Sequence, residues 1–172
     1  VLVLYDIELQ KRRIRKVDID IQLRNEGITN FLIPDWVGNA DIVLTTYEVL
    51  RDQEFSLSTT KFSIMICDEA QKIKSPSALV TKAAKAQNAR LKIACTGTPV
   101  ENSLTDLWCL FDFIQPMYLG ILNEFSRTYR RPIEANTETE RQAIEELRKL
   151  ISDQILRRTK TQMREKYPDL VR

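Results

Sequence analysis

Two adjacent acids, Asp68 and Glu69, stand where a strand is expected to end. They directly follow the apolar run at residues 62–67, which is typical of a strand buried on both faces. In open parallel sheets, ligands bind outside the carboxyl ends of the strands. Carboxylates there cost free energy unless a cation or hydrogen bonds compensate them. A Mg²⁺ ion would do so for Asp68, and Glu69 would orient a water for attack on a phosphate. The structural alternative is an ordinary acidic start to a helix.

Hydroxyl side chains close two other apolar runs in the same way. Thr45 and Thr46 end the run that begins at residue 42, and Thr96 and Thr98 end the run that begins at residue 91. We expect the hydroxyls of Thr96 and Thr98 to hydrogen-bond Gln71 or Glu69 across the strand ends. Gly97 lets the backbone turn tightly between them. Three strand ends therefore carry carboxylates or hydroxyls, which favours a ligand site over an ordinary helix start.

The elements that must position these residues alternate between strand and helix. Strands are expected at residues 1–4, 42–45, 62–67 and 91–96, and helices at 48–53, at 104–114 and from Ser75-Pro76 to about residue 88. Trp108 lies on the apolar stripe of the helix at 104–114, so we expect it in the core against Leu104 and Phe111. The alternation predicts an α/β fold with a parallel sheet flanked by helices.

The last third of the chain differs in character. Thr137 and Glu140 have the spacing of a capping box, and an apolar stripe follows at residues 143–151. A short β-like stretch at 154–156 leads into Arg157 and Arg158, and we expect the apolar pair at 155–156 to anchor these arginines. We therefore expect a sheet-bearing part at residues 1–116 and a helical carboxy-terminal extension at residues 117–172.

Composition excludes several classes of chemistry. The 172 residues carry a net charge of +2 and contain no histidine. Pairs of serine or cysteine with histidine, and zinc sites that need imidazole, are therefore excluded. The four glycines are followed by Ile28, Asn39, Thr98 and Ile121, so the sequence holds no Gly-Lys-Ser/Thr phosphate loop.

The remaining features bear on location and surface. Cys67, Cys95 and Cys109 lie in apolar runs and are interpreted as small buried side chains in a reducing compartment. Basic residues cluster at 11–16, either as a solvated helix or hairpin edge or as a phosphate-contacting patch. No apolar stretch is long enough for a membrane helix. The chain starts inside an apolar run without methionine, so we expect an intracellular segment of a larger protein that has no membrane partner.

Three strings in this order resemble the SNF2 family of helicase-like ATPases, which move along double-stranded DNA. They are TTYEVL at residues 45–50, DEAQKIK at 68–74 and TGTPVENSLTDLW at 96–108. They are similar to motif Ib, the DEAH/DEAQ-type motif II and motif III of that family. Residues 125–133 and ILRRTK at 155–160 also match, whereas residues 7–40 match poorly. Gln71 is similar to what bacterial members often carry, which implies a bacterial cytoplasmic protein.

The resemblance implies a role for each matching residue. Asp68 would hold Mg²⁺, Glu69 would be the catalytic base, and Gln71 would couple the state of bound ATP to lobe movement. Thr96, Gly97 and Thr98 would complete the nucleotide side, and Thr45, Thr46, Arg157 and Arg158 would lie near the DNA. The implied fold is the carboxy-terminal half of the first RecA-like lobe.

The departures from the family leave two functions open. The Walker A lysine and the second RecA-like lobe do not occur in these residues, so we expect the chain alone to hydrolyse no ATP. It would be a fragment of an ATP-dependent translocase on double-stranded DNA, completed by those missing parts. The alternative is an inactive remnant that binds DNA or protein. A metal-dependent nuclease would need more acids from separate strands.

Overall fold

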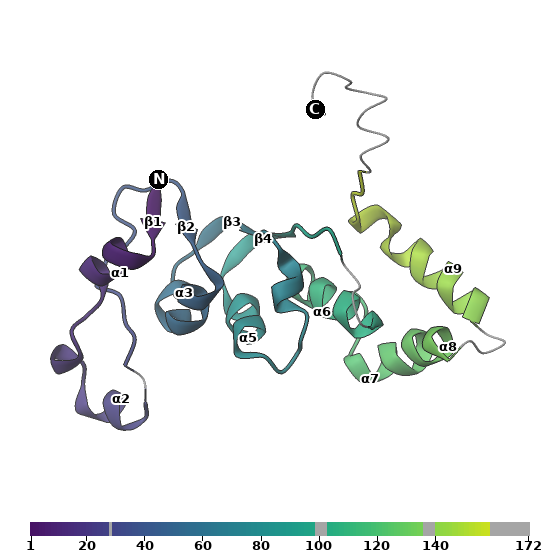
Figure 1. Cartoon of the computed structure of the whole chain (residues 1–172), viewed down its shortest axis with the longest axis horizontal. Coiled ribbons are helices and arrows are strands. Elements are labelled where there is room, and N and C mark those ends of the chain that lie inside the picture. The colour runs from purple at the N-terminus through teal and green to yellow at the C-terminus, as the bar shows by residue number, and fades with distance from the viewer. Residues whose placement is uncertain (28, 99–102, 136–139, 159–172) are drawn as a thin grey trace, which may run out of the picture. The chain divides into compact units, whose positions relative to one another are not determined.

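The computed structural model describes residues 1–27, 29–98, 103–135 and 140–158. The chain forms two compact units, Val1–Leu122 and Asn123–Arg172, and each is described by itself. The bounds of the helices and strands in the first unit, which Figure 1 labels, are as follows: β1 Leu2–Leu4, α1 Asp6–Arg12, η1 Lys16–Asp18, α2 Ile21–Asn25, β2 Val43–Thr45, α3 Tyr47–Asp52, α4 Glu54–Ser58, β3 Phe62–Cys67, η2 Ala70–Ile73, α5 Leu79–Ala86, β4 Ala89–Ala94 and α6 Leu104–Ile114.

The strands of the first unit form two parallel pairs. β1 pairs with β2, with Leu4 opposite Thr45, and β3 pairs with β4, with Cys67 opposite Ala94. This confirms the expected α/β fold with parallel strands. Among the described residues the two pairs are separate sheets, and the helices α3 and α4 lie between β2 and β3 in the sequence.

The core lies between the strands and the helices α3, α5 and α6. Ala83 and Ala84 of α5 and Phe113 of α6 have no exposed surface. Trp108 is 8% exposed, which confirms its expected place in the core, and its Nε1–H donates to the carbonyl of Gly120 at 3.0 Å. The Lys85 ammonium lies 4.9 Å from the centre of the Trp108 ring. The packing of α6 against the strands holds the ends of the strands in position.

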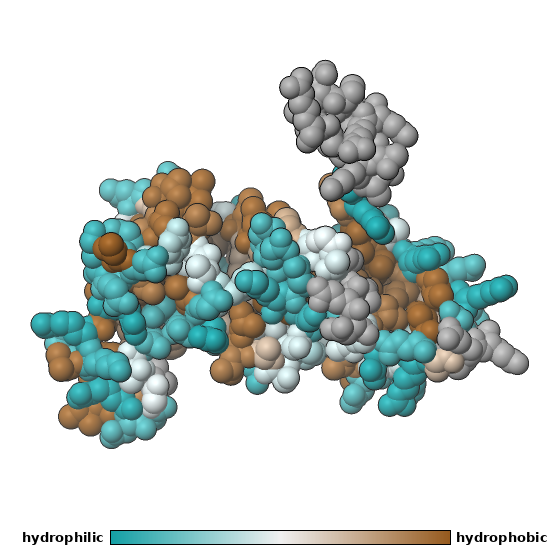
Figure 2. Space-filling model, viewed as in Figure 1, coloured by the Kyte–Doolittle hydropathy of each residue, from teal (hydrophilic) through white to brown (hydrophobic). Residues whose placement is uncertain are grey.

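The expectation that the strand at 62–67 is buried on both faces is wrong for the described residues. Parallel register places Ile64 beside Leu91 and Ile66 beside Ile93, and these four side chains are 37–64% exposed. α6 packs on the opposite face, where the ammonium of Lys92 lies over the Phe113 ring at 5.3 Å. Figure 2 shows hydrophobic surface over the strands of this unit. Cys95, which follows β4, is also exposed rather than buried.

Two expected element boundaries also differ. The helix expected from Ser75-Pro76 begins at Leu79, because Ala78 has extended backbone angles and its N–H closes a turn onto the carbonyl of Ser75 at 3.1 Å. The β-like stretch at 154–156 is not a strand. Gln154 ends the short helix η4, and no described strand pairs with the residues that follow it. The capping-box residue Thr137 lies outside the described residues.

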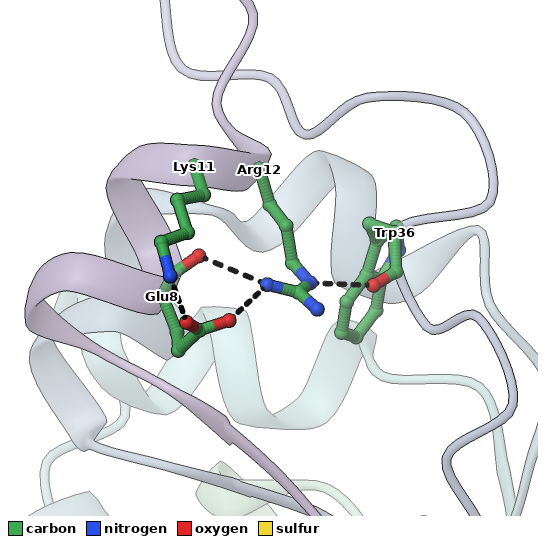
Figure 3. Close-up of polar contacts among 4 residues, drawn as sticks. All are labelled: Glu8, Lys11, Arg12 and Trp36. Atoms are coloured by element: carbon green, nitrogen blue, oxygen red, sulfur yellow. Dashed lines mark hydrogen bonds and ion pairs between the residues drawn. The ribbon is translucent and has the colours of Figure 1, made fainter.

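The basic cluster at 11–16 makes contacts within the chain. Arg12 donates from Nε to the carbonyl of Trp36 at 3.0 Å and pairs with Glu8, which also accepts from Lys11 at 2.7 Å (Figure 3). Arg15 pairs with Asp18 at 2.8 Å. These contacts favour the interpretation as a solvated helix edge over a phosphate-contacting patch.

The second unit is helical, as expected for the extension. It contains η3 Ser126–Arg130, α8 Arg131–Glu134, α9 Glu140–Ile151 and η4 Ser152–Gln154, and α7 Leu122–Phe125 spans its start. Ala143 and Leu147 of α9 are buried, and α9 packs against η3 and α8. No helix among the described residues is long and apolar enough to cross a membrane.

We expect native-state alkylation to modify Cys95 first and Cys109 last. Cys95 is exposed, whereas burial raises the pKa of the Cys109 thiol to about 11, so little thiolate forms near neutral pH. The Cys109 thiol also donates to the carbonyl of Ile73 at 3.2 Å. Mass spectrometry after brief iodoacetamide treatment at pH 8 measures the order, and urea-unfolded chain is the control in which the order disappears. Rapid modification of native Cys109 would contradict the described packing.

Candidate functional site

The two acids lie in a tight turn between β3 and the short helix η2. Glu69 adopts a left-handed backbone conformation with φ 49° and ψ 47°, which a non-glycine residue rarely occupies. The N–H of Glu69 donates to Oδ1 of Asp68 at 3.0 Å. The next N–H, on Ala70, donates to the carbonyl of Cys95 at 2.9 Å, so the turn is tied to the end of β4. This geometry turns the Glu69 side chain out of the line of the strand.

A continuous chain of hydrogen bonds joins Glu69 to the end of β4. The Nε2–H of Gln71 donates to Oε2 of Glu69 at 2.6 Å, and the Thr96 hydroxyl donates to Oε1 of Gln71 at 2.8 Å. The N–H of Thr98 in turn donates to the Thr96 hydroxyl oxygen at 3.1 Å. The expected contact between Thr96 and Gln71 is therefore confirmed. In this chain, Thr98 contributes its backbone N–H.

The hydrogen-bond chain from Thr98 to Glu69 orients the Glu69 carboxylate without placing a cation beside it. A carboxylate accepts only, so the amide of Gln71 must present its N–H to Glu69 and its oxygen to Thr96. Among the described residues no salt bridge engages Asp68 or Glu69, and both are exposed. Gln71 engages Oε2 of Glu69, which leaves Oε1 for a water molecule.

The donor set at Asp68 fits a magnesium ion that is shared with a substrate. Oδ1 of Asp68 accepts the N–H of Glu69, and no hydrogen bond from a described residue engages Oδ2. No group of three or more His, Cys, Asp or Glu side chains that could hold a metal occurs among the described residues. Mg²⁺ commonly takes one or two carboxylates and completes its shell with waters and phosphate oxygens. Asp68 therefore suits a phosphate-bound Mg²⁺ better than a protein-only metal cage.

The threonines at the end of β2 are placed at the same kind of strand end. The Thr45 hydroxyl donates to the carbonyl of Leu4 at 2.9 Å and so ties β2 to β1. The Thr46 hydroxyl oxygen accepts the N–H of Val49 at 3.3 Å and caps α3. The pKa of the Glu48 carboxyl is lowered, first by its own backbone N–H and next by the side chain of Thr46. Both threonines thus have a structural use that the sequence did not reveal.

Tyr47 belongs to this site, although sequence analysis gave it no role. Its hydroxyl donates to the backbone carbonyl of Asp68 at 2.6 Å and links the start of α3 to the acid pair. The Lys72 ammonium lies 5.7 Å from the centre of its ring. Burial, followed by the neighbouring Cys67 and Asp68, raises the pKa of the Tyr47 phenol. Its place inside the TTYE string was the available sequence signal.

The paired arginines lie in the second unit. Arg157 and Arg158 are exposed, and Arg158 donates from Nη1 to the carbonyl of Arg157 at 3.2 Å. The expectation that the preceding apolar pair anchors them is wrong, because Ile155 is 40% and Leu156 78% exposed. Among the described residues, no strand or packed side chain supports these arginines. Their exposed guanidinium groups are therefore accessible to a partner outside the chain.

Parallel strands that end in acids and hydroxyls define an α/β protein of the RecA-like class, and the comparisons with known proteins specify the family. The chain belongs to the SNF2-related family: the profile of the SNF2-related domain matches residues 7–172. The match thus begins well before residue 41, so the expectation that residues 7–40 fall outside the resemblance is wrong. The matched range, residues 7–172, contains both the acid turn and the hydrogen-bond chain.

Individual relatives agree with this family. The chain is 54% identical over 171 residues to the Zorya protein ZorD of Escherichia coli, covering 99% of this chain and 16% of that protein. It is 40% identical over 122 residues to the putative ATP-dependent helicase/translocase YwqA of Bacillus subtilis, covering 71% of this chain and 13% of that protein. The solved Sulfolobus solfataricus SWI2/SNF2 ATPase core in complex with dsDNA superposes with a TM-score of 0.64 at 38% identity, covering 76% of this chain and 28% of that one. The chain therefore spans a minor part of these relatives.

We expect Thr96→Val to lower the free energy of unfolding by about 1 kcal/mol, because it leaves Oε1 of Gln71 without its described donor. Urea denaturation of the chain measures the change, and the side-chain NH₂ resonance of Gln71 should move as its contact with Glu69 loosens. Thr128→Val is the matched control, since Thr128 is exposed in the second unit. Equal effects of the two substitutions would show that the hydrogen-bond chain contributes nothing to stability.

Proposed function

We propose that this chain is part of an ATP-dependent motor of the SNF2 type, which couples ATP hydrolysis to movement along double-stranded DNA. The observation that carries the proposal is the hydrogen-bond chain from Thr96 through Gln71 to Glu69. It connects Glu69, the candidate general base, to a neighbouring strand end. The polypeptide belongs to the SNF2-related family, and a solved relative is an ATPase core in complex with dsDNA. In a bacterial cell such a motor would act in the cytoplasm, where the chromosome lies.

The acids divide the work of phosphoryl transfer between them. Asp68 would hold a Mg²⁺ ion, which would supply charge neutralisation at the transferred phosphoryl group. Glu69 would orient the attacking water and accept its proton. Gln71 fixes the Glu69 carboxylate from one side, so a shift of the strand end at Thr96 would change the direction of the base. Gly97 and Thr98 form the turn that such a shift would move.

The complete activity needs parts beyond these 172 residues. Phosphoryl transfer in such motors uses a lysine-bearing phosphate loop and an arginine finger, and the sequence contains no Gly-Lys-Ser/Thr. We propose that the full-length protein supplies the phosphate loop and a second RecA-like lobe. This follows the relatives, of which the matched region is a minor share.

Double-stranded DNA is the proposed polymer partner. Thr45 and Thr46 would lie near its backbone, at the end of β2 where α3 begins. Arg157 and Arg158 would contact phosphate or a carboxylate of the second lobe, since both are exposed guanidinium groups suited to paired oxygens.

A non-catalytic module that binds DNA or protein is the second candidate. The absence of a phosphate loop from the sequence is the observation that favours it. Such a module would keep the hydrogen-bond chain as a structural device, and replacement of Glu69 would then change binding or stability without changing any turnover.

We expect Glu69→Gln in the full-length protein to retain ATP binding and to lose roughly 100- to 10,000-fold in DNA-stimulated turnover, because an amide cannot accept the proton from water. Phosphate release measures turnover, and a fluorescent ATP analogue measures binding. Asp68→Asn should instead raise the Mg²⁺ concentration needed for binding. Glu145→Gln removes an exposed carboxylate of α9 and serves as the control. Turnover of Glu69→Gln equal to that of the unsubstituted protein would show that Glu69 is not the base, whereas absence of turnover from both proteins would favour the non-catalytic candidate.

We expect Arg157→Ala with Arg158→Ala to lower DNA-stimulated ATPase several-fold while basal ATPase changes little. If the partner is phosphate, the slope of DNA affinity against salt concentration should also flatten, because fewer counterions are released. Filter binding at several salt concentrations measures the slope. The control is Arg141→Ala with Arg148→Ala, which removes the same charge from exposed positions of α9. Equal loss of basal and stimulated rates with a lower melting temperature would mean a purely structural role.

A further inference from the structure

Tyr47 reaches from the first turn of α3 to the backbone of the acid pair. Its hydroxyl donates to the carbonyl oxygen of Asp68 at 2.6 Å, although the two residues are 21 positions apart in sequence. The hydrogen bonds of Ala70 and Gln71 link the acid turn to the end of β4, whereas this bond links it to α3, which follows β2. Tyr47 is therefore the described side chain that connects the end of β2 with the turn after β3.

The bond from Tyr47 completes the fixation of one peptide group. The carbonyl of Asp68 and the N–H of Glu69 belong to the same planar peptide, so they cannot rotate independently. Tyr47 holds the carbonyl, and Oδ1 of Asp68 holds the N–H at 3.0 Å. Rotation of this peptide changes ψ of Asp68 and φ of Glu69, and the φ of Glu69 is the left-handed value of 49°.

The bond is well suited to a positioning role. The phenol is half-buried, and its hydroxyl carries a proton that it can donate. The Lys72 ammonium over the ring further restricts where the ring can lie. Loss of the hydroxyl alone would leave the Asp68 carbonyl to water and let the peptide relax toward commoner angles, while the ring would stay in place.

We propose that Tyr47 is a positioning residue, which holds the Asp68–Glu69 peptide so that the Glu69 carboxylate points at the attacking water and which transmits contacts at Thr45 and Thr46 to that carboxylate. The proposal rests on the function proposed above. Thr46 is adjacent to Tyr47 and caps the helix that carries it. A displacement of this strand end by DNA therefore moves the phenol, and with it the peptide that sets the direction of the base.

Tyr47→Phe in the full-length protein tests this role. We expect about a tenfold loss of DNA-stimulated kcat, which corresponds to about 1.4 kcal/mol of lost transition-state stabilisation. The KM for ATP and the melting temperature should stay within error, and basal ATPase should fall less than the stimulated rate. Tyr129→Phe is the matched control, because Tyr129 packs its ring 5.6 Å from Phe125 in the second unit.

The outcomes separate this proposal from the function on which it rests. A normal kcat for Tyr47→Phe alongside an inactive Glu69→Gln would overturn the positioning role and leave the motor function standing. Proportional loss of basal and stimulated rates together with a lower melting temperature would also overturn it, since the hydroxyl would then serve only the fold. Normal turnover by Glu69→Gln would instead refute Glu69 as the base, and absence of DNA-stimulated turnover from the unsubstituted full-length protein would refute the proposed motor itself.

Discussion

The left-handed turn at Glu69 is the constraint on which the site depends. Such a conformation costs a non-glycine residue about 1–3 kcal/mol and persists only where the surroundings over-determine it. Here the surroundings are the β3–β4 pairing on one side and the fully buried Ala70 and Ile73 on the other. Because Ala70 also donates its N–H to Cys95, the chain cannot extend β3 past Cys67 without losing that bond and two buried side chains. The acids are thus exposed, but their backbone is anchored in the core.

Throughout the first unit, the interior is held by fixed contacts and the strand ends carry polar side chains. Beneath the strand ends, Lys85 pairs with Asp112 at 2.6 Å, and Lys92 donates to the carbonyl of Lys85 at 2.8 Å, so these partly buried cations are satisfied by fixed partners. At the strand ends, Glu69 is held by the neutral donor Gln71. A cation in that place would lower the basicity of the carboxylate, whereas an amide orients it and leaves its charge available. The chemistry of the strand ends therefore depends on Glu69 having an amide, that of Gln71, as its hydrogen-bond donor.

Sequence reasoning found the parts of this arrangement that local pattern controls. The strand ends, the stripe that buries Trp108 and the contact of Thr96 with Gln71 follow from apolar runs and from parallel strands that end at one edge. Sequence reasoning failed where the burial or contact of a residue depends on a segment that is distant in the sequence. The exposure of Ile64 and Leu91 depends on which face a helix covers, and a run of apolar residues does not encode that choice. The contact of Tyr47 with Asp68 joins two strings that were assigned separate roles, and spacing alone gives no sign of a side chain that bridges them.

The energies of the hydrogen bonds in this site suit a device that changes state. The two neutral bonds of this hydrogen-bond chain, from Thr98 to Thr96 and from Thr96 to Gln71, contribute about 1 kcal/mol each, because water replaces them when they break. The bond from Gln71 to the Glu69 carboxylate contributes about 1.5–3 kcal/mol. Conformers that a ligand interconverts differ by a few kcal/mol, which is the sum of a few such bonds. Buried ion pairs would resist rearrangement far more strongly, since breaking one leaves an unpaired charge in the interior. A partly buried set of hydrogen-bonded amide and hydroxyl groups on a rigid backbone therefore lets a small movement of one strand end redirect Glu69 while the core stays intact.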